Sequence, residues 1–179
     1  MDKLTPKETS KGAEEIVLTQ IKQDFITPAN AIFDYVDMVE KVLNEAELAS
    51  EDEIAQIKSS CNHLIDQYEV AFVQNTGINA ESSKKTPEEY SELRHNLRTP
   101  LNAIIGYSEI LMEDYEDDIE ETAIEDFQQI INLARETEKA IEVFVDYIRG
   151  ESIDPNNDNA SNQLESAESL FKSLGDIEY

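Results

Sequence analysis

The sequence predicts an all-α fold in which two antiparallel helical hairpins form a pseudo-two-fold four-helix bundle. Gly and Pro number only five each among the 179 residues, whereas strong helix formers such as Glu, Ala, Leu and Gln are abundant. Apolar residues recur at spacings of three and four over long stretches of the chain. An internal repeat supplies two hairpins, and they must pair because a single hairpin leaves its apolar stripe half exposed.

The first hairpin is expected over residues 13–75, after a polar N-terminus at 1–12 that we expect to be disordered. Its first helix covers Ala13–Ala49, where apolar positions follow a nearly heptad period. Pro28 interrupts this pattern, and a proline inside a helix removes one backbone donor and produces a kink. The sequence therefore predicts one long helix with a structural kink at Pro28.

The second helix of this hairpin is expected to begin after Ser50. Glu53 follows this serine three residues later, which is the pattern of a capping box. Cys61 falls in the apolar register of the helix, which indicates a small buried hydrophobic residue rather than a reactive thiol. The small, polar and unpatterned stretch at 76–85 then predicts a linker.

The second hairpin is expected over residues 86–150. Thr86 is followed by Pro87 at the first helical position and by Glu89 three residues after the threonine, which predicts a capped helix start. An acidic turn separates the two helices, and Gly150 provides a C-terminal stop.

The remaining residues, 151–179, predict a polar linker followed by a short amphipathic helix at Leu164–Leu174. The chain ends a few residues later without an obvious end signal, so a fragment of a larger protein is one expectation.

Composition excludes several classes of function. The net charge of −26 argues against nucleic acid and against an anionic membrane surface, because both ligands require a basic footprint. A single cysteine excludes an internal disulfide and a multi-cysteine metal site. No apolar run could span a bilayer and no signal-peptide core begins the chain, so we expect a cytoplasmic protein that binds no cofactor or metal.

The chain repeats itself with an offset of 72 residues, which places Gln23–Ile32 over His95–Ile104. Thr-Pro and Asn-Ala-Ile coincide in the two segments, and the apolar positions superpose. Because both hairpins lie in one chain, we expect a monomeric pseudo-dimer. The alternative is a homodimer in which each hairpin pairs with its copy in another chain.

His95 is the principal candidate for chemistry. It lies two residues from each of the apolar positions Leu93 and Leu97, about 200° around the helix from each, so its imidazole should be outside the bundle and accessible. Imidazole is largely neutral at physiological pH and can attack phosphorus without a strong base.

Two arginines accompany this histidine. Arg94 and Arg98 flank it, and in so acidic a chain they predict a local electropositive spot suited to a phosphoryl group or to an acidic partner. The other histidine, His63, has no such neighbours, and we interpret it as a surface or boundary residue.

The stretch HNLRTPLNAIIGYSEIL, from His95 to Leu111, resembles the H-box of the dimerisation and histidine-phosphotransfer (HisKA-type) domain of two-component sensor histidine kinases. The two-helix layout of 86–150 is similar to that domain as well. The resemblance implies a four-helix bundle with His95 as the phosphoacceptor and with Pro100 as the helix kink just below it.

The chain departs from the family pattern in ways that bear on function. Asn96 replaces the usual acidic neighbour that assists proton removal, and a carboxamide cannot act as a base. Thr99 occupies the position that in the family helps to orient water for dephosphorylation. Gln23 stands at the histidine position of the first repeat, which therefore resembles a degenerate copy. No glycine-rich or asparagine box of the family's ATP-binding domain is present.

These observations predict a phosphotransfer module of a two-component phosphorelay. Its site would comprise His95 with Asn96, Arg98 and Thr99. A histidine kinase in trans or a phosphorylated response-regulator receiver would load the histidine, and the receiver would carry the Mg²⁺. The alternative is a non-catalytic module of a larger signalling protein for dimerisation or receiver docking. A weaker third hypothesis is a phosphatase that acts through Thr99.

Overall fold

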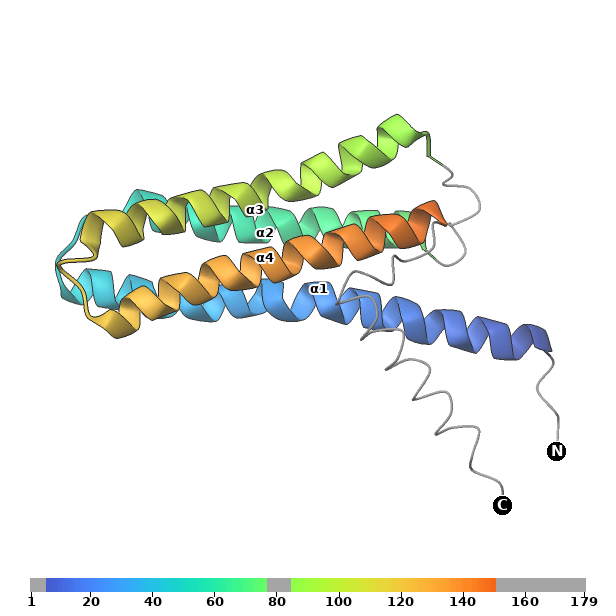
Figure 1. Cartoon of the computed structure of the whole chain (residues 1–179), viewed down its shortest axis with the longest axis horizontal. Coiled ribbons are helices and arrows are strands. Elements are labelled where there is room, and N and C mark those ends of the chain that lie inside the picture. The colour runs from blue at the N-terminus through green and yellow to red at the C-terminus, as the bar shows by residue number, and fades with distance from the viewer. Residues whose placement is uncertain (1–5, 77–84, 151–179) are drawn as a thin grey trace, which may run out of the picture.

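The computed structural model describes residues 6–76 and 85–150, with side chains from residue 12 onward. These residues form four helices and no strand (Figure 1). In chain order the helices are α1 (Pro6–Glu45), α2 (Glu51–Asn75), α3 (Pro87–Tyr115) and α4 (Glu121–Arg149). The predicted all-α class is confirmed.

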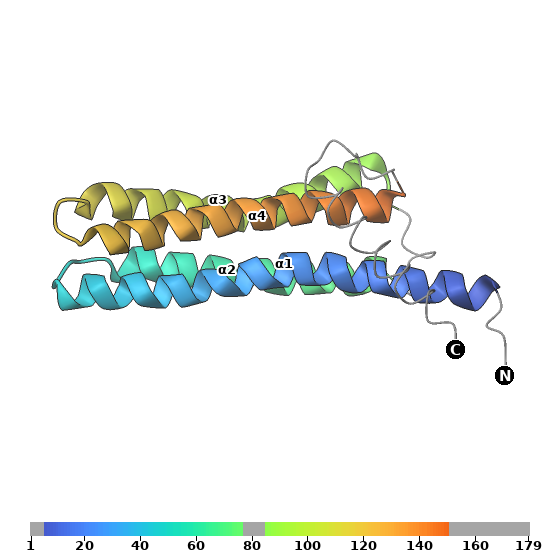
Figure 2. The ribbon, with the colours of Figure 1, turned by 60° about the horizontal axis from the view of Figure 1, so that its bottom comes forward.

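The four helices form a bundle within this one chain. The α1–α2 turn and the α3–α4 turn lie at the same end, and the two hairpins form two layers (Figures 1 and 2). Helix α1 packs most extensively against α4, and α2 packs most extensively against α3. Each helix therefore has its largest contact with a helix of the other hairpin. The predicted four-helix bundle is confirmed.

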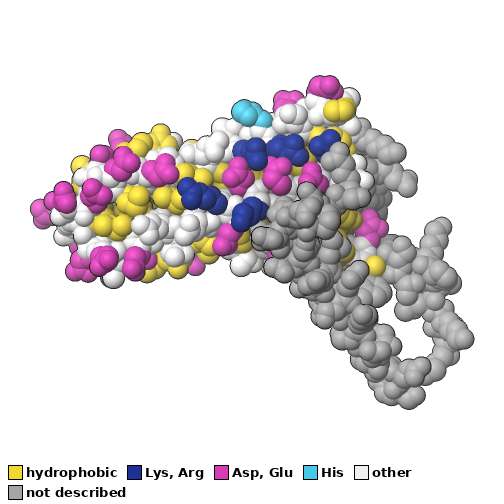
Figure 3. All heavy atoms as spheres, viewed as in Figure 1, with side chains coloured by type: hydrophobic (Ala, Val, Ile, Leu, Met, Phe, Trp, Pro, Cys, Tyr) yellow, Lys and Arg dark blue, Asp and Glu magenta, His cyan; other side chains and the backbone are white. Residues whose placement is uncertain are grey.

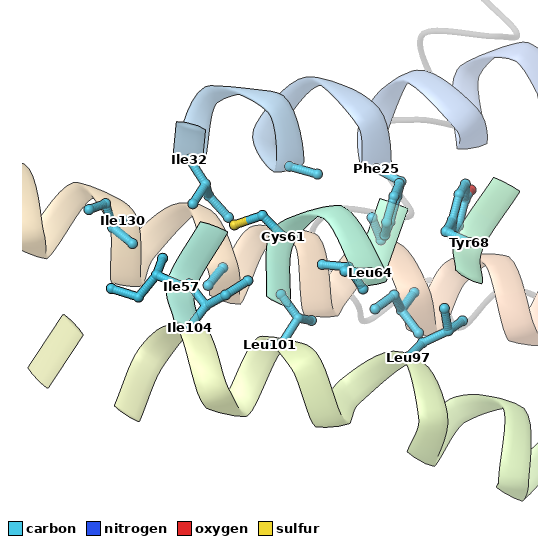
Figure 4. Packing of buried hydrophobic residues seen from close by; sticks show 14 of the residues in the cluster. Phe25, Ile32, Ile57, Cys61, Leu64, Tyr68, Leu97, Leu101, Ile104 and Ile130 are labelled. Carbon is cyan, nitrogen blue, oxygen red and sulfur yellow. The ribbon is translucent and has the colours of Figure 1, made fainter. Parts of the chain in front are cut away.

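The apolar positions at spacings of three and four form a single core between the helices (Figure 4). Phe25 and Tyr68 stack within it, with ring centroids 3.5 Å apart. Cys61 is buried in this core, and burial raises the pKa of its thiol to about 12. The interpretation of Cys61 as a small hydrophobic residue is therefore confirmed.

The ends of the second hairpin follow the predicted signals. The Thr86 hydroxyl accepts a hydrogen bond from the Glu89 N–H at 3.3 Å, and the Thr86 N–H donates to the Glu89 carboxylate at 2.7 Å. This reciprocal pair is the capping box. At the other end Gly150 adopts a φ of 73°, a left-handed conformation that glycine tolerates without a steric penalty.

The first hairpin differs from prediction at both ends of its first helix and in the capping of its second helix. Helix α1 begins at Pro6, although 1–12 was predicted to be disordered, and ends at Glu45 rather than at residue 49. Helix α2 starts after Ser50 as predicted, but the serine side chain makes no capping bond. With ψ at 8° rather than extended, Ser50 does not present its hydroxyl to the helix, so the predicted capping box is wrong.

Two predicted segments lie outside the described residues. They are the linker, of which 77–84 is not described, and the C-terminal segment 151–179 with its short helix at 164–174.

The two prolines lie inside continuous helices. Pro28 and Pro100 are buried at equivalent positions of α1 and α3, and the helix continues on both sides of each. Proline has no N–H, so the carbonyl four residues earlier lacks its usual helical donor. In α3 that carbonyl belongs to Asn96, the residue next to His95.

The hairpins have matching patterns of exposure. Residues 72 apart in α1 and α3 share the same degree of burial at nearly every position from 23 to 40. Each buried position of α2 from Ile54 to Ala71 coincides with a buried position of α4 that lies 73 residues later. An ion pair matches as well: Lys22–Glu69 in the first hairpin corresponds to Arg94–Glu142 in the second.

Candidate functional site

His95 projects from α3 on its exposed side. Leu97, two residues later, is fully buried, and Leu93 is partly buried against the core, so the helical period directs the imidazole away from the core. The exposure predicted for His95 from its register is therefore confirmed.

A groove between α2 and α3 contains this histidine. Helix α3 contributes His95, Asn96, Thr99, Pro100 and Ala103. Helix α2 contributes Ser59, Ser60, His63 and Gln67. The groove therefore has one wall from each hairpin, and most of the side chains that line it are polar.

The second histidine of the chain lines the same groove. His63 is exposed on α2, and it also lines a neighbouring depression that contains Asn96 and Asp66. His63 was expected to be a surface or boundary residue, and its place in the same groove as His95 was not predicted. The only sequence signal was its place beside the buried Leu64, which indicates a position at the edge of the core but does not identify the helix it faces.

The arginines that flank His95 are directed toward α4. Arg94 Nε lies 2.8 Å from Glu142 Oε2, and Arg94 Nη2 donates to Asp146 Oδ1 at 3.4 Å. Arg98 Nε lies 3.2 Å from Glu138 Oε1, and its Nη2 lies 3.0 Å from Glu142 Oε1. Figure 3 shows a row of basic side chains beside a row of acidic ones over α3 and α4, with a histidine near its edge.

These ion pairs correct the predicted electropositive spot. Three carboxylates of α4 neutralise the two guanidinium groups, and neither arginine lines the groove. The sequence could not reveal this, because the partners lie on another helix more than 35 residues away along the chain. Arg98, a predicted site residue, is therefore a link between α3 and α4 in this structure.

Thr99 lines the groove one helical turn after His95. Its hydroxyl donates to the His95 carbonyl at 2.9 Å, a local bond that is common for threonine in helices. The hydroxyl proton is thus directed to the backbone rather than into the groove. This arrangement lends no support to a phosphatase role for Thr99.

The corresponding surface of the first hairpin carries Gln23. Gln23 is exposed on α1, and in the repeat it is equivalent to His95 on α3. The next residue, Asp24, corresponds to Asn96. Burial raises the pKa of the Asp24 carboxyl, and the hydrogen bond from Gln20 at 2.7 Å opposes this effect only in part.

The described part of the chain contains no group of three or more His, Cys, Asp or Glu side chains that could hold a metal ion. Within the same residues, no helix combines the length and apolar character needed to cross a membrane.

Comparison with known proteins identifies the second hairpin. Residues 88–153 match the family model of the His Kinase A (phospho-acceptor) domain. Neither the curated proteins nor the solved structures give a match. Domains of this kind dimerise and act in phosphotransfer with kinase and response-regulator partners of two-component systems. The chain therefore contains a HisKA-type domain, whose matched region includes His95 and the whole of α3–α4 except its first residue.

Proposed function

We propose that this chain is a histidine-phosphotransfer module, in which His95 accepts a phosphoryl group and passes it to or from a response-regulator receiver. The observation that carries the proposal is the exposure of His95 on the HisKA-matched helix, at the edge of an open groove. An accessible imidazole is what a receiver's active site must reach.

The transfer step follows from the chemistry of imidazole. A neutral ring nitrogen of His95 attacks phosphorus, the N–P bond forms, and the P–O bond to the receiver's aspartate breaks. The electron pair of that bond remains on the carboxylate, and the imidazole proton passes to solvent. The reverse reaction returns the phosphoryl group to the aspartate. Neither direction requires a base at residue 96, where this chain has Asn96.

We further propose that the first hairpin is a degenerate copy of the second. The matching burial of α1 and α3, the equivalent prolines and the equivalent ion pairs support this interpretation. Gln23 then occupies the phosphoacceptor position, and its carboxamide cannot hold a phosphoryl group. The bundle would present one reactive face instead of two.

A labelling experiment tests the proposal. The purified chain is incubated with a phosphorylated receiver or with a phosphodonor kinase, and acid-labile, base-stable label is measured. We expect label on the wild type and none on His95→Ala. Because His95 is exposed, this substitution should leave the thermal unfolding of the bundle almost unchanged.

A non-catalytic docking module is the second candidate. Helix α1 keeps nearly the same burial pattern as α3 with Gln23 in place of the histidine, so the fold does not depend on the chemistry. If a receiver binds but the wild type acquires no label, or if His95→Ala is labelled equally, the docking function replaces phosphotransfer.

A further inference from the structure

We infer that His63, from the first hairpin, donates a hydrogen bond to the phosphoryl group carried by His95. The inference rests on the proposed phosphotransfer function. It assigns to the hairpin without a phosphoacceptor a direct part in the chemistry, because α2 would supply the second wall of the phosphoryl site. His63 also lies outside residues 88–153, the part of the chain that matches the phospho-acceptor domain.

His63 and His95 line the same groove from opposite helices, and both imidazoles are exposed. The residues of α2 that line it recur at helical spacing, so one stripe of α2 faces the groove. A phosphoryl group bonded to a ring nitrogen of His95 would extend the side chain into the space that His63 borders.

The groove has no basic side chain in its lining to balance the charge of a phosphoryl group. A phosphoryl group brings a charge of about −2, and in this structure the nearest guanidinium groups, Arg94 and Arg98, are paired with carboxylates of α4. The groove itself is lined by hydroxyl, amide and imidazole groups and by no lysine or arginine. Among the side chains that line it, His63 is the one on α2 that can donate a hydrogen bond in the neutral form and gain a positive charge.

Helix α4 carries a carboxylate at the position where α2 carries the imidazole of His63. The buried positions of α2 from Ile54 to Ala71 match buried positions of α4 at a separation of 73 residues, which places Glu136 at the position equivalent to His63. Glu136 is exposed, like His63. A carboxylate there would repel a phosphoryl group, so the imidazole of α2 occurs in the half of the bundle that also contains the candidate phosphoacceptor.

The predicted role is stabilisation of charge on the phosphoryl oxygens as the group moves. Catalysis of phosphoryl transfer depends mainly on positioning and on donors directed at those oxygens. An imidazole N–H fixed on α2 would supply one such donor without a change in the covalent chemistry of His95. The expected loss on its removal is about tenfold in rate, as for one hydrogen bond to a charged group.

The test uses the full chain and phosphoramidate as a small phosphodonor. In this reaction the N–P bond to His95 forms, the P–N bond of phosphoramidate breaks, and ammonia leaves with the imidazole proton. We expect His63→Ala to slow labelling of His95 about tenfold, and His63→Gln, which keeps an N–H donor, to restore most of the rate. Asn62→Ala is the matched control, because Asn62 is exposed on α2 and does not line the groove.

A second arm uses a phosphorylated receiver and separates phosphoryl contact from docking. We expect His63→Ala to lower kcat and to leave KM almost unchanged. Wild-type rates for His63→Ala with phosphoramidate, or an equal loss in Asn62→Ala, would overturn the inference. An effect confined to KM with the receiver would overturn it too, because His63 would then contact the partner instead. Absence of label on the wild type from either donor would overturn the proposed function itself.

Discussion

The bundle has two equivalent faces with different chemistry. Between α2 and α3, His95 and His63 line one groove, whereas on the opposite side α1 carries Gln23 and α4 carries Glu136 at the equivalent positions. Much of the scaffold beneath them is shared, since α1 and α3 have nearly the same burial pattern and the same Thr-Pro step. The comparison teaches that burial specifies the bundle, while a few exposed residues specify its chemistry.

The two faces also differ in packing. Helix α1 extends further toward its N-terminus than α3 does. Within the shared length, Val17 of α1 packs against the core, whereas the equivalent Glu89 of α3 is exposed. On α4, Val143 is buried with 3 % of its surface exposed, whereas the equivalent Val70 of α2 is 56 % exposed. The side of the bundle with His95 is therefore the more open one.

Moving the histidine to the other face should produce the largest effect. We expect His95→Gln to abolish labelling, because the carboxamide of glutamine cannot hold a phosphoryl group. The double variant His95→Gln/Gln23→His should regain label at no more than about a tenth of the wild-type rate, because Glu136 replaces the imidazole donor there. Phosphoramidate labelling measures both variants.

Adding Glu136→His to the double variant sharpens this comparison. We expect the rate to increase, because α4 would then present an imidazole at the position that His63 occupies on α2. If the double variant is already labelled as fast as the wild type, the chemistry of the opposing helix does not matter.

Asp24 provides a comparison of stability, with a smaller expected effect. Burial raises the pKa of its carboxyl, so the folded chain holds this proton more tightly than the unfolded chain. The resulting stability is complete below the unfolded pKa, about 4, and is lost as the pH rises through the higher folded-state pKa. Asp24→Asn, which installs the residue type of Asn96, should therefore be more stable than wild type at neutral pH.

Urea unfolding at neutral and at acidic pH measures this difference. The advantage of Asp24→Asn should shrink as the pH falls below about 4, where aspartate is protonated in both states. Asp34→Asn, at an exposed position of the same helix, controls for the loss of one charge from an acidic chain. An equal gain from both substitutions would show that burial of Asp24 is not the cause.

The smallest effect is expected at Arg98, whose counterpart in α1 is Ile26. Its ion pairs with α4 are partly exposed, so Arg98→Ile should cost less than about 1 kcal/mol in urea unfolding. Labelling of His95 should change by less than about twofold, because the guanidinium faces α4 instead of the groove. A tenfold loss of labelling with unchanged stability would show that Arg98 leaves α4 to bind the phosphoryl group.

Much of the fold could be predicted from local patterns. The apolar spacing identified the helices and the core, the sequence around Thr86 identified the start of α3, and Gly150 identified the end of α4. The same periodicity placed His95 outside the bundle. The capping box predicted at Ser50 was wrong, because the backbone of the turn before α2 determines the direction of the serine side chain.

The sequence by itself determined the helices, their buried stripes and the exposure of His95, because these properties depend on residues within a few helical turns. Only the tertiary structure decided what surrounds that histidine. It paired Arg94 and Arg98 with carboxylates of α4 and brought His63 to the groove. These neighbours depend on which helices are adjacent and on their relative rotation, and both are fixed by packing of the whole core.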